Sequence, residues 1–162
     1  MDYKDLITEA IIEFPELVEE YKDKYSEIVG NHKLILSMPI DLYEIHQRAY
    51  EQIILDNSTP SVYQFYEEII RHHFIKLIDE YYTDRANDIV CFKISKMVEF
   101  FEKMASSGDV EVENVLLIGV FEGIIDDKVK LKLILTLLKE KSLLLMYKLQ
   151  DYHDVDFSEV QK

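Results

Sequence analysis

Cysteine, proline, glycine and tryptophan are all scarce in this chain. Its 162 residues include one cysteine, three prolines, four glycines and no tryptophan. So little glycine and proline disfavours turn-rich all-β folds, and an apolar fraction of 48% disfavours disorder. The single cysteine, Cys91, excludes an intramolecular disulfide and favours a reducing cytoplasm. Without an acid–base pair around it, we expect Cys91 to be a small core residue, not a reactive thiol.

Long hydrophobic runs are missing as well. The longest uncharged apolar run, Val115 to Phe121, is too short to cross a bilayer, and the first nine residues lack the basic region of a signal peptide. We therefore expect a cytoplasmic protein with no membrane span. The length fits one domain with a sizeable core.

Positive charge is outnumbered, since 18 Lys and Arg residues accompany 32 Asp and Glu residues and the formal net charge is −14. Such a field repels phosphate backbones and anionic lipids, so we expect neither nucleic acid nor a membrane as a partner, whereas a basic protein is permitted. The charge is uneven. Residues 1–30 carry nine acids and three bases, residues 99–127 carry eight acids and one base, and residues 128–148 carry six lysines and one acid. These segments are either solvated helix faces or binding surfaces.

What the chain does have is helical periodicity throughout, with no strand-like alternation of useful length. The first segment sets an apolar face against an acidic one that contains Glu9, Glu13, Glu16 and Glu20. Pro15 is expected to kink this segment or to begin a second helix.

Capping signals divide the rest of the chain into further helices. They are expected from Pro39 or Asp41 to Asp56, from Thr59-Pro60 to Tyr82, from Thr83 or Asp84 to Ser107, over 110–125, from the caps Asp126-Asp127 to Leu138, and over 141–153. Gly108 ends one helix and Asp109 caps the next. The prediction is an all-α, single-domain bundle of about seven or eight helices over residues 1–153, with the C-terminal half as stacked antiparallel helical hairpins. Residues 154–162 are expected to form a polar, frayed tail.

No catalytic constellation emerges from these elements. Glu68 and His72 could share a helix face, but a stable metal site needs three or four ligands, and neither His73 nor His46 has an identified companion. The serines at predicted helix ends are typical caps, and the glycines are not clustered as a phosphate loop requires. We therefore predict no catalytic, cofactor-binding or metal-ligating residue, no cofactor, and no enzymatic activity.

Two further features are open to more than one interpretation. Glu122 lies in the apolar run from Val115 to Ile125, so it either points to solvent or is buried and paired, for example with a lysine beyond Lys128. Eleven tyrosines offer large contact areas with polar tips, and a partly exposed subset beside acidic patches would suit protein recognition.

Part of the chain resembles a known family. The segments Phe100-Phe101-Glu102-Lys103-Met104, Ser107-Gly108-Asp109-Val110-Glu111-Val112 and Val120-Phe121-Glu122-Gly123-Ile124 resemble a pattern in small bacterial all-helical proteins of unknown function. The resemblance lies mainly in residues 90–150, and the closing Leu-Lys-Glu-Lys-Ser departs from it where a Gly-Pro is expected. Members of that family are often found beside polymorphic-toxin and immunity genes. The resemblance therefore implies an immunity-type binding role.

The leading hypothesis is an acidic cytoplasmic protein-binding protein that occludes a basic partner, such as a cognate toxin. The candidate partner-binding residues are Glu9, Glu13, Glu16, Glu20, Asp109, Glu111, Glu113, Asp126 and Asp127. A structural or regulatory module that acts as a homodimer is the first alternative. An enzyme with an unrecognised carboxylate site is the second.

The purified protein is expected to carry no stoichiometric transition metal, because no ligand set reaches three converging residues. Elemental analysis of the full chain measures this directly. One equivalent of zinc, iron or manganese that disappears on His72→Gln substitution would contradict the prediction.

Overall fold

A computed structural model describes residues 1–18, 20, 62–153 and 157. These residues form helices and no strands, which confirms the all-α prediction for the described part of the chain. They comprise six continuous helical segments and a short helical piece at Leu17 and Val18. The helix predicted for residues 39–56 and the caps predicted at Thr59-Pro60 lie outside the described residues.

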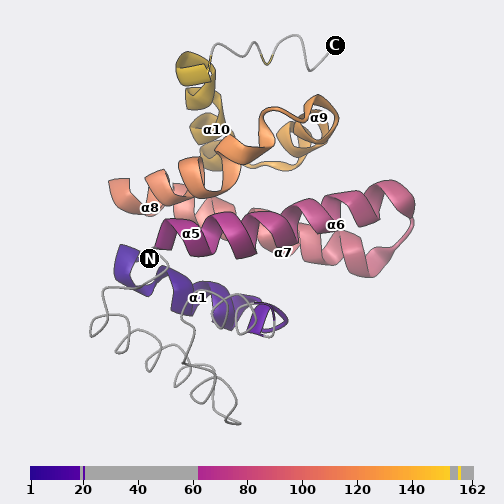
Figure 1. The fold of residues 1–162 in the computed structure, drawn as a ribbon, viewed down its shortest axis with the longest axis horizontal. Helices are drawn as coiled ribbons and strands as arrows, with labels where there is room; N and C mark the ends of the chain where they lie inside the picture. The colour runs from indigo at the N-terminus through magenta and orange to yellow at the C-terminus, as the bar shows by residue number, and fades with distance from the viewer. Residues whose placement is uncertain (19, 21–61, 154–156, 158–162) are drawn as a thin grey trace.

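From α5 onward, the helices follow one another with short connections (Figure 1). A 3-10 turn, η1 (Tyr3–Asp5), leads into α1 (Leu6–Glu13). A continuous helix is then formed by α5 (Val62–Phe65), the π-helical η3 (Tyr66–Arg71) and α6 (His72–Thr83), and it is followed by α7 (Asp88–Ala105). The next continuous helix comprises α8 (Val110–Asn114), the π-helical η4 (Val115–Phe121) and the 3-10 turn η5 (Glu122–Ile124). The last two helices are α9 (Lys128–Leu137) and α10 (Glu140–His153).

Local capping chemistry sets several of these boundaries where the sequence predicts them. Gly108 has a φ of 72°, the left-handed conformation that ends a helix, and Asp109 accepts a hydrogen bond of 2.9 Å from the N–H of Glu111. Asp127 caps α9 by accepting from the N–H groups of Val129 and Lys130. The caps predicted at Gly108, Asp109 and Asp127 are therefore confirmed, whereas Asp126 is not the cap of α9.

The sequence predicts that the helix corresponding to α7 begins at Thr83 or Asp84, and this prediction is wrong. Thr83 ends α6, and the carboxylate of Asp84 accepts from the N–H of Ala86 within the turn. Asn87 is the N-cap of α7, because its side-chain oxygen accepts from Ile89 and Val90. A carboxylate such as that of Asp84 can accept hydrogen bonds at a helix start, but here it accepts one within the turn between α6 and α7.

Pro15 separates two helical pieces. The N–H of Phe14 still bonds to the carbonyl of Ala10, but α1 ends at Glu13, and helical backbone resumes at Leu17 and Val18. Of the two expected outcomes at Pro15, the structure shows a new helical piece.

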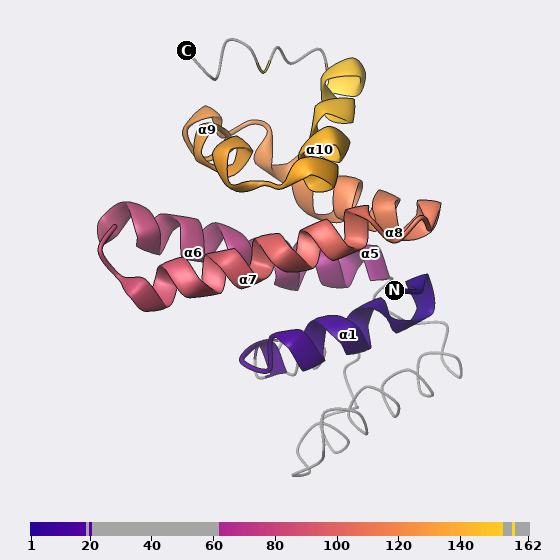
Figure 2. The ribbon, with the colours of Figure 1, turned by 180° about the vertical axis from the view of Figure 1, so that it is seen from behind.

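The helices α6 and α7 form an antiparallel hairpin, with α1 on one side and α8 to α10 on the other (Figures 1 and 2). Aromatic rings of α7 join these parts. Phe100 meets Phe14 edge to face with a centroid separation of 5.3 Å, on the α1 side. Phe101 meets Phe74 of α6 at 5.1 Å and Phe121 of η4 at 5.8 Å. Two consecutive residues of α7 thus pack against different neighbours, Phe100 on the α1 side and Phe101 against α6 and η4.

The two π-helical stretches pack against each other at a glycine. A Cβ atom on Gly119 of η4 would lie only 3.1 Å from Cβ of Tyr66 in η3. Tyr66 is fully buried, and its hydroxyl donates a hydrogen bond of 3.0 Å to the carbonyl of Leu6 in α1. Gly119 therefore permits the close approach of two helices, one of which also holds α1.

The start of α10 is capped by a residue from another helix. Glu102 of α7 accepts hydrogen bonds from the N–H groups of Lys141 and Ser142, each of 2.9 Å, and from the Ser142 hydroxyl at 2.7 Å. Burial tends to raise the pKa of Glu102, but these hydrogen bonds and the charge of Lys139 outweigh it, and the pKa is lowered. An ionised carboxylate at the positive end of α10 thus holds α10 against α7.

The apolar run Val115 to Phe121 is η4, and most of its side chains lie in the core. Within the described ranges, no helix combines the length and the apolar character that a membrane span requires.

Replacing Gly119 with alanine is expected to lower the free energy of unfolding by about 1 kcal/mol. Overpacking costs roughly 1–3 kcal/mol, and the gain in helix propensity of about 1 kcal/mol offsets only part of it. The measurement is urea denaturation followed by circular dichroism. Gly123→Ala is the comparison variant: its new Cβ would overlap Nη1 of Arg71, but the three nearest atoms all belong to that flexible side chain, which can move aside. A Gly119→Ala variant as stable as Gly123→Ala would contradict the close crossing.

Candidate interaction surface

Three segments that are distant in the sequence begin at one end of the molecule. The starts of α1, α5 and α8 lie together there in both views (Figures 1 and 2). Tyr3 comes from η1, Tyr63 from α5 and Glu111 from α8. The Tyr63 hydroxyl donates a long hydrogen bond of 3.5 Å to a carboxylate oxygen of Glu111, which is 48 residues away in the chain. Sequence spacing contains no signal for this arrangement.

Electrostatics at this end favour protonated tyrosines. Burial raises the pKa of Tyr3 and of Tyr63, and the negative charge of Glu111 raises both further. Both hydroxyls therefore remain hydrogen-bond donors at neutral pH and above. Both tyrosines are only half-buried, so a partner can contact ring and hydroxyl alike.

Two more acids lie at the N-cap and within α8. Asp109 caps the helix, and Glu113 forms an ion pair with Lys148 of α10 at 3.7 Å. Between them the apolar side chain of Val110 is 67% exposed. We use the name acidic tyrosine surface for Tyr3, Tyr63, Asp109 and Glu111. The tyrosines are the members that sequence reasoning did not select.

The predicted acidic stripe is divided by the break at Pro15, so Glu9 and Glu13 lie on α1 while Glu16 and Glu20 follow it. Glu13 contacts α7, because its carboxylate oxygens lie 3.5 Å from the ammonium groups of Lys96 and Lys103. Glu16 lies 3.9 Å from the ring of His73 in α6. The partly buried Glu13 and the exposed Glu16 thus both have intramolecular neighbours on the hairpin.

The candidates at the start of α9 also have local roles. Asp127 caps the helix and pairs with Lys130 at 3.5 Å. Lys130 in turn pairs with Asp79 of α6 at 2.9 Å, and the hydrogen bond to Asp79 is the main cause of its raised pKa. Asp126 is exposed.

Glu122 is partly exposed, and its carboxylate lies 2.9 Å from Nε2 of His153 at the end of α10. The sequence left open whether this residue is buried or solvent-facing, and the structure places it at the edge of the core. The partner of Glu122 is therefore His153, and not one of the lysines that the sequence suggested.

Histidine, cysteine and carboxylate side chains do not cluster as a metal site would require. Within the described ranges, no three of them lie close enough to hold an ion together. His72 is exposed and close to the carbonyl of Glu67, while His46 lies outside the described residues. Ser142 is fully buried as part of the cap on α10, which confirms its predicted capping role.

The described residues define an all-helical domain with an acidic, tyrosine-bearing end. The model of a family described as a domain of unknown function (DUF7674) matches residues 7–154, and the chain belongs to that family. The match extends well beyond the resemblance noted for residues 90–150. Neither a search of curated proteins nor a search of solved structures gives a match. An association with toxin and immunity genes stays a prediction.

His73 stands apart because its buried Nε2 has no hydrogen-bond partner among the described residues. The distance of 3.9 Å to Glu16 is too long for a hydrogen bond. Burial lowers the pKa of His73; Lys93 and Lys76 act in the same direction, while Glu16 and Glu80 oppose them. The folded protein therefore favours the neutral imidazole.

Acidification from pH 7.5 to pH 5 is expected to destabilise the wild type more than a His73→Gln variant. The unfolded chain binds the proton first, at a pKa of about 6.5, so stability falls below that pH until the folded state is protonated too. Urea denaturation midpoints at several pH values measure the difference. His72→Gln, at an exposed neighbour, should lose as much stability as the wild type. If His73→Gln loses as much stability on acidification as the wild type, protonation of His73 is not the cause of the loss.

Proposed function

We propose that this chain is a protein-binding protein that occludes a basic protein partner with its acidic tyrosine surface. The observation that carries the proposal is the juxtaposition of Tyr3 and Tyr63 with Glu111 at the end where α1, α5 and α8 begin. Half-buried tyrosines beside a carboxylate offer apolar contact area, hydroxyl donors and negative charge in one place. A lysine or arginine of a partner has a complementary site there.

The overall charge supports a basic partner. A net charge of −14 attracts a positively charged surface from a distance and accelerates its association. It also repels the anionic substrates of a basic enzyme, so a bound chain would block such a substrate both sterically and electrostatically. An immunity-type protein against a basic cognate toxin would use this arrangement, and it remains the favoured specific form of the proposal.

Homodimer formation is the second candidate, and a separate observation favours it. Ile89 and Phe92 of α7 are 69% and 65% exposed, respectively. Both side chains lie in the first half of α7, and large apolar and aromatic side chains are enriched in the buried centres of protein–protein interfaces. Sedimentation velocity of the full chain separates the two candidates, because a dimer at micromolar concentration supports this one.

Co-purification with the tagged full chain from the native cell, followed by mass spectrometry, is the experiment that tests the first proposal. The captured partner is expected to be basic. Its association rate should fall by about three- to tenfold, and should depend less on salt, for a chain carrying Asp109→Asn and Glu111→Gln. Asparagine retains the capping ability of residue 109, so folding is preserved.

The control removes two charges elsewhere, with Glu80→Gln on α6 and Asp151→Asn on α10, both exposed positions. It should associate at close to the wild-type rate. Equal slowing by both pairs would show that net charge, and not the acidic tyrosine surface, steers the partner. A partner that is not basic would refute the proposal outright.

A further inference from the structure

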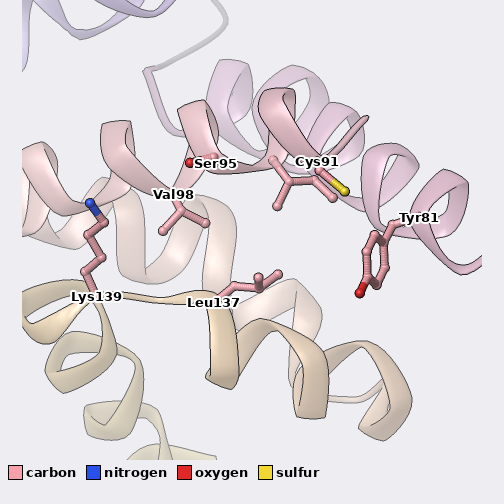
Figure 3. A pocket seen from close by; sticks show the side chains of 7 residues that line it. Tyr81, Cys91, Ser95, Val98, Leu137 and Lys139 are labelled. Carbon is pink, nitrogen blue, oxygen red and sulfur yellow. The ribbon is translucent and has the colours of Figure 1, made fainter. Parts of the chain in front are cut away.

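A pocket of about 320 Å³ opens between α7 and the segment that joins α9 to α10. It lies away from the acidic tyrosine surface: its lining comes from the end of α6, the first half of α7 and the residues around Leu137 (Figure 3). The volume is at the lower end of the range for small-molecule sites. A ligand much smaller than a typical drug would fill it.

The walls of the pocket are largely apolar. Ile94 and Val98 of α7, four residues apart, both line the pocket. Val98 faces Leu137, which approaches from the end of α9 (Figure 3). Ile94 and Val98 are nearly fully buried, so their positions are set by the core. An apolar ligand body would replace water along these side chains.

One end of the pocket carries a positive charge. The lysine side chain of Lys139 lies at that end, and its ammonium group forms an ion pair with Glu99. An ammonium has three donors, so Lys139 retains donors for a second carboxylate. Lys139 is a lining residue and Glu99 is not.

The opposite end holds Tyr81 and Cys91 (Figure 3). Cys91 is the single cysteine of the chain, and its sulfur lies 4.0 Å from the carbonyl of Arg85. The expectation of a small core residue is thus modified, because Cys91 is only partly buried and lines this pocket. Its thiol provides a unique chemical reporter of whether the pocket is occupied.

We propose that this pocket binds a small amphipathic carboxylate, with its apolar body against Ile94, Val98 and Leu137 and its carboxylate on the ammonium of Lys139. The charge of Lys139 distinguishes this ligand class from neutral apolar compounds of the same size. Glu99 then competes with the ligand's carboxylate, because it is paired with the ammonium of Lys139 when no ligand is bound.

Octanoate and octan-1-ol are suitable probes, since they share an apolar chain and differ in the charged end. Octanoate should slow the alkylation of Cys91 by iodoacetamide in a saturable way, and calorimetry should show that it binds the full chain about two- to fivefold more tightly than the alcohol, the range expected for a partly exposed ion pair. Absence of protection by octanoate, or equal affinity for the alcohol, would overturn the proposal.

Three single substitutions test whether the ammonium of Lys139 binds the carboxylate of octanoate. Lys139→Gln should remove the preference for octanoate, whereas Lys141→Gln removes the same charge from a nearby exposed residue outside the lining and should retain the preference. Glu99→Gln should tighten octanoate binding by about two- to fivefold, because it frees the ammonium of Lys139. Octanoate binding that does not respond to Lys139→Gln, or that weakens in Glu99→Gln, contradicts the assignment. Circular dichroism checks that each variant is folded.

Discussion

The close crossing of two π-helical stretches at Gly119 is the constraint on which the rest of the described structure depends. Because residue 119 has no side chain, η4 approaches Cβ of Tyr66 in η3, and the Tyr66 hydroxyl reaches the backbone of α1. At the end of η4, the ring of Phe121 contacts the ring of Phe101 in α7. One short contact therefore places α1, the hairpin of α6 and α7, and the C-terminal helices relative to one another. A side chain at position 119 would act on all three connections at once, since packed cores transmit strain.

A second organising interaction is electrostatic. The carboxylate of Glu102 accepts from the N–H groups of Lys141 and Ser142 at the start of α10, and it also accepts from the Ser142 hydroxyl. This interaction fixes the segment between α9 and α10 against α7. It therefore fixes both sides of the pocket, because Val98 lies one turn before Glu102 and Lys139 lies just before Ser142.

The charges of the chain divide into those that hold helices together and those that remain at the surface. Several lysines pair with acids of other helices, as Lys96 and Lys103 do with Glu13 and as Lys148 does with Glu113. Each such exposed pair contributes only about 0–1 kcal/mol, so these contacts orient the helices more than they stabilise them. Acidic side chains exceed basic ones by a wide margin, which leaves a net charge of −14. The acidic tyrosine surface and the pocket are separate features, the first polar and the second lined largely by apolar side chains.

The sequence by itself determined the features that depend on neighbouring residues. Helical periodicity predicted an all-α fold, and the caps at Gly108, Asp109 and Asp127 were predicted because capping joins groups only two or three residues apart. The same local reasoning failed at Asp84, whose carboxylate closes a turn instead of starting a helix. Only the tertiary structure decided that Tyr63 meets Glu111 and that Glu102 caps α10. Such contacts join residues about 40 to 50 positions apart, and their geometry follows from how helices pack, which the periodicity of each helix does not specify.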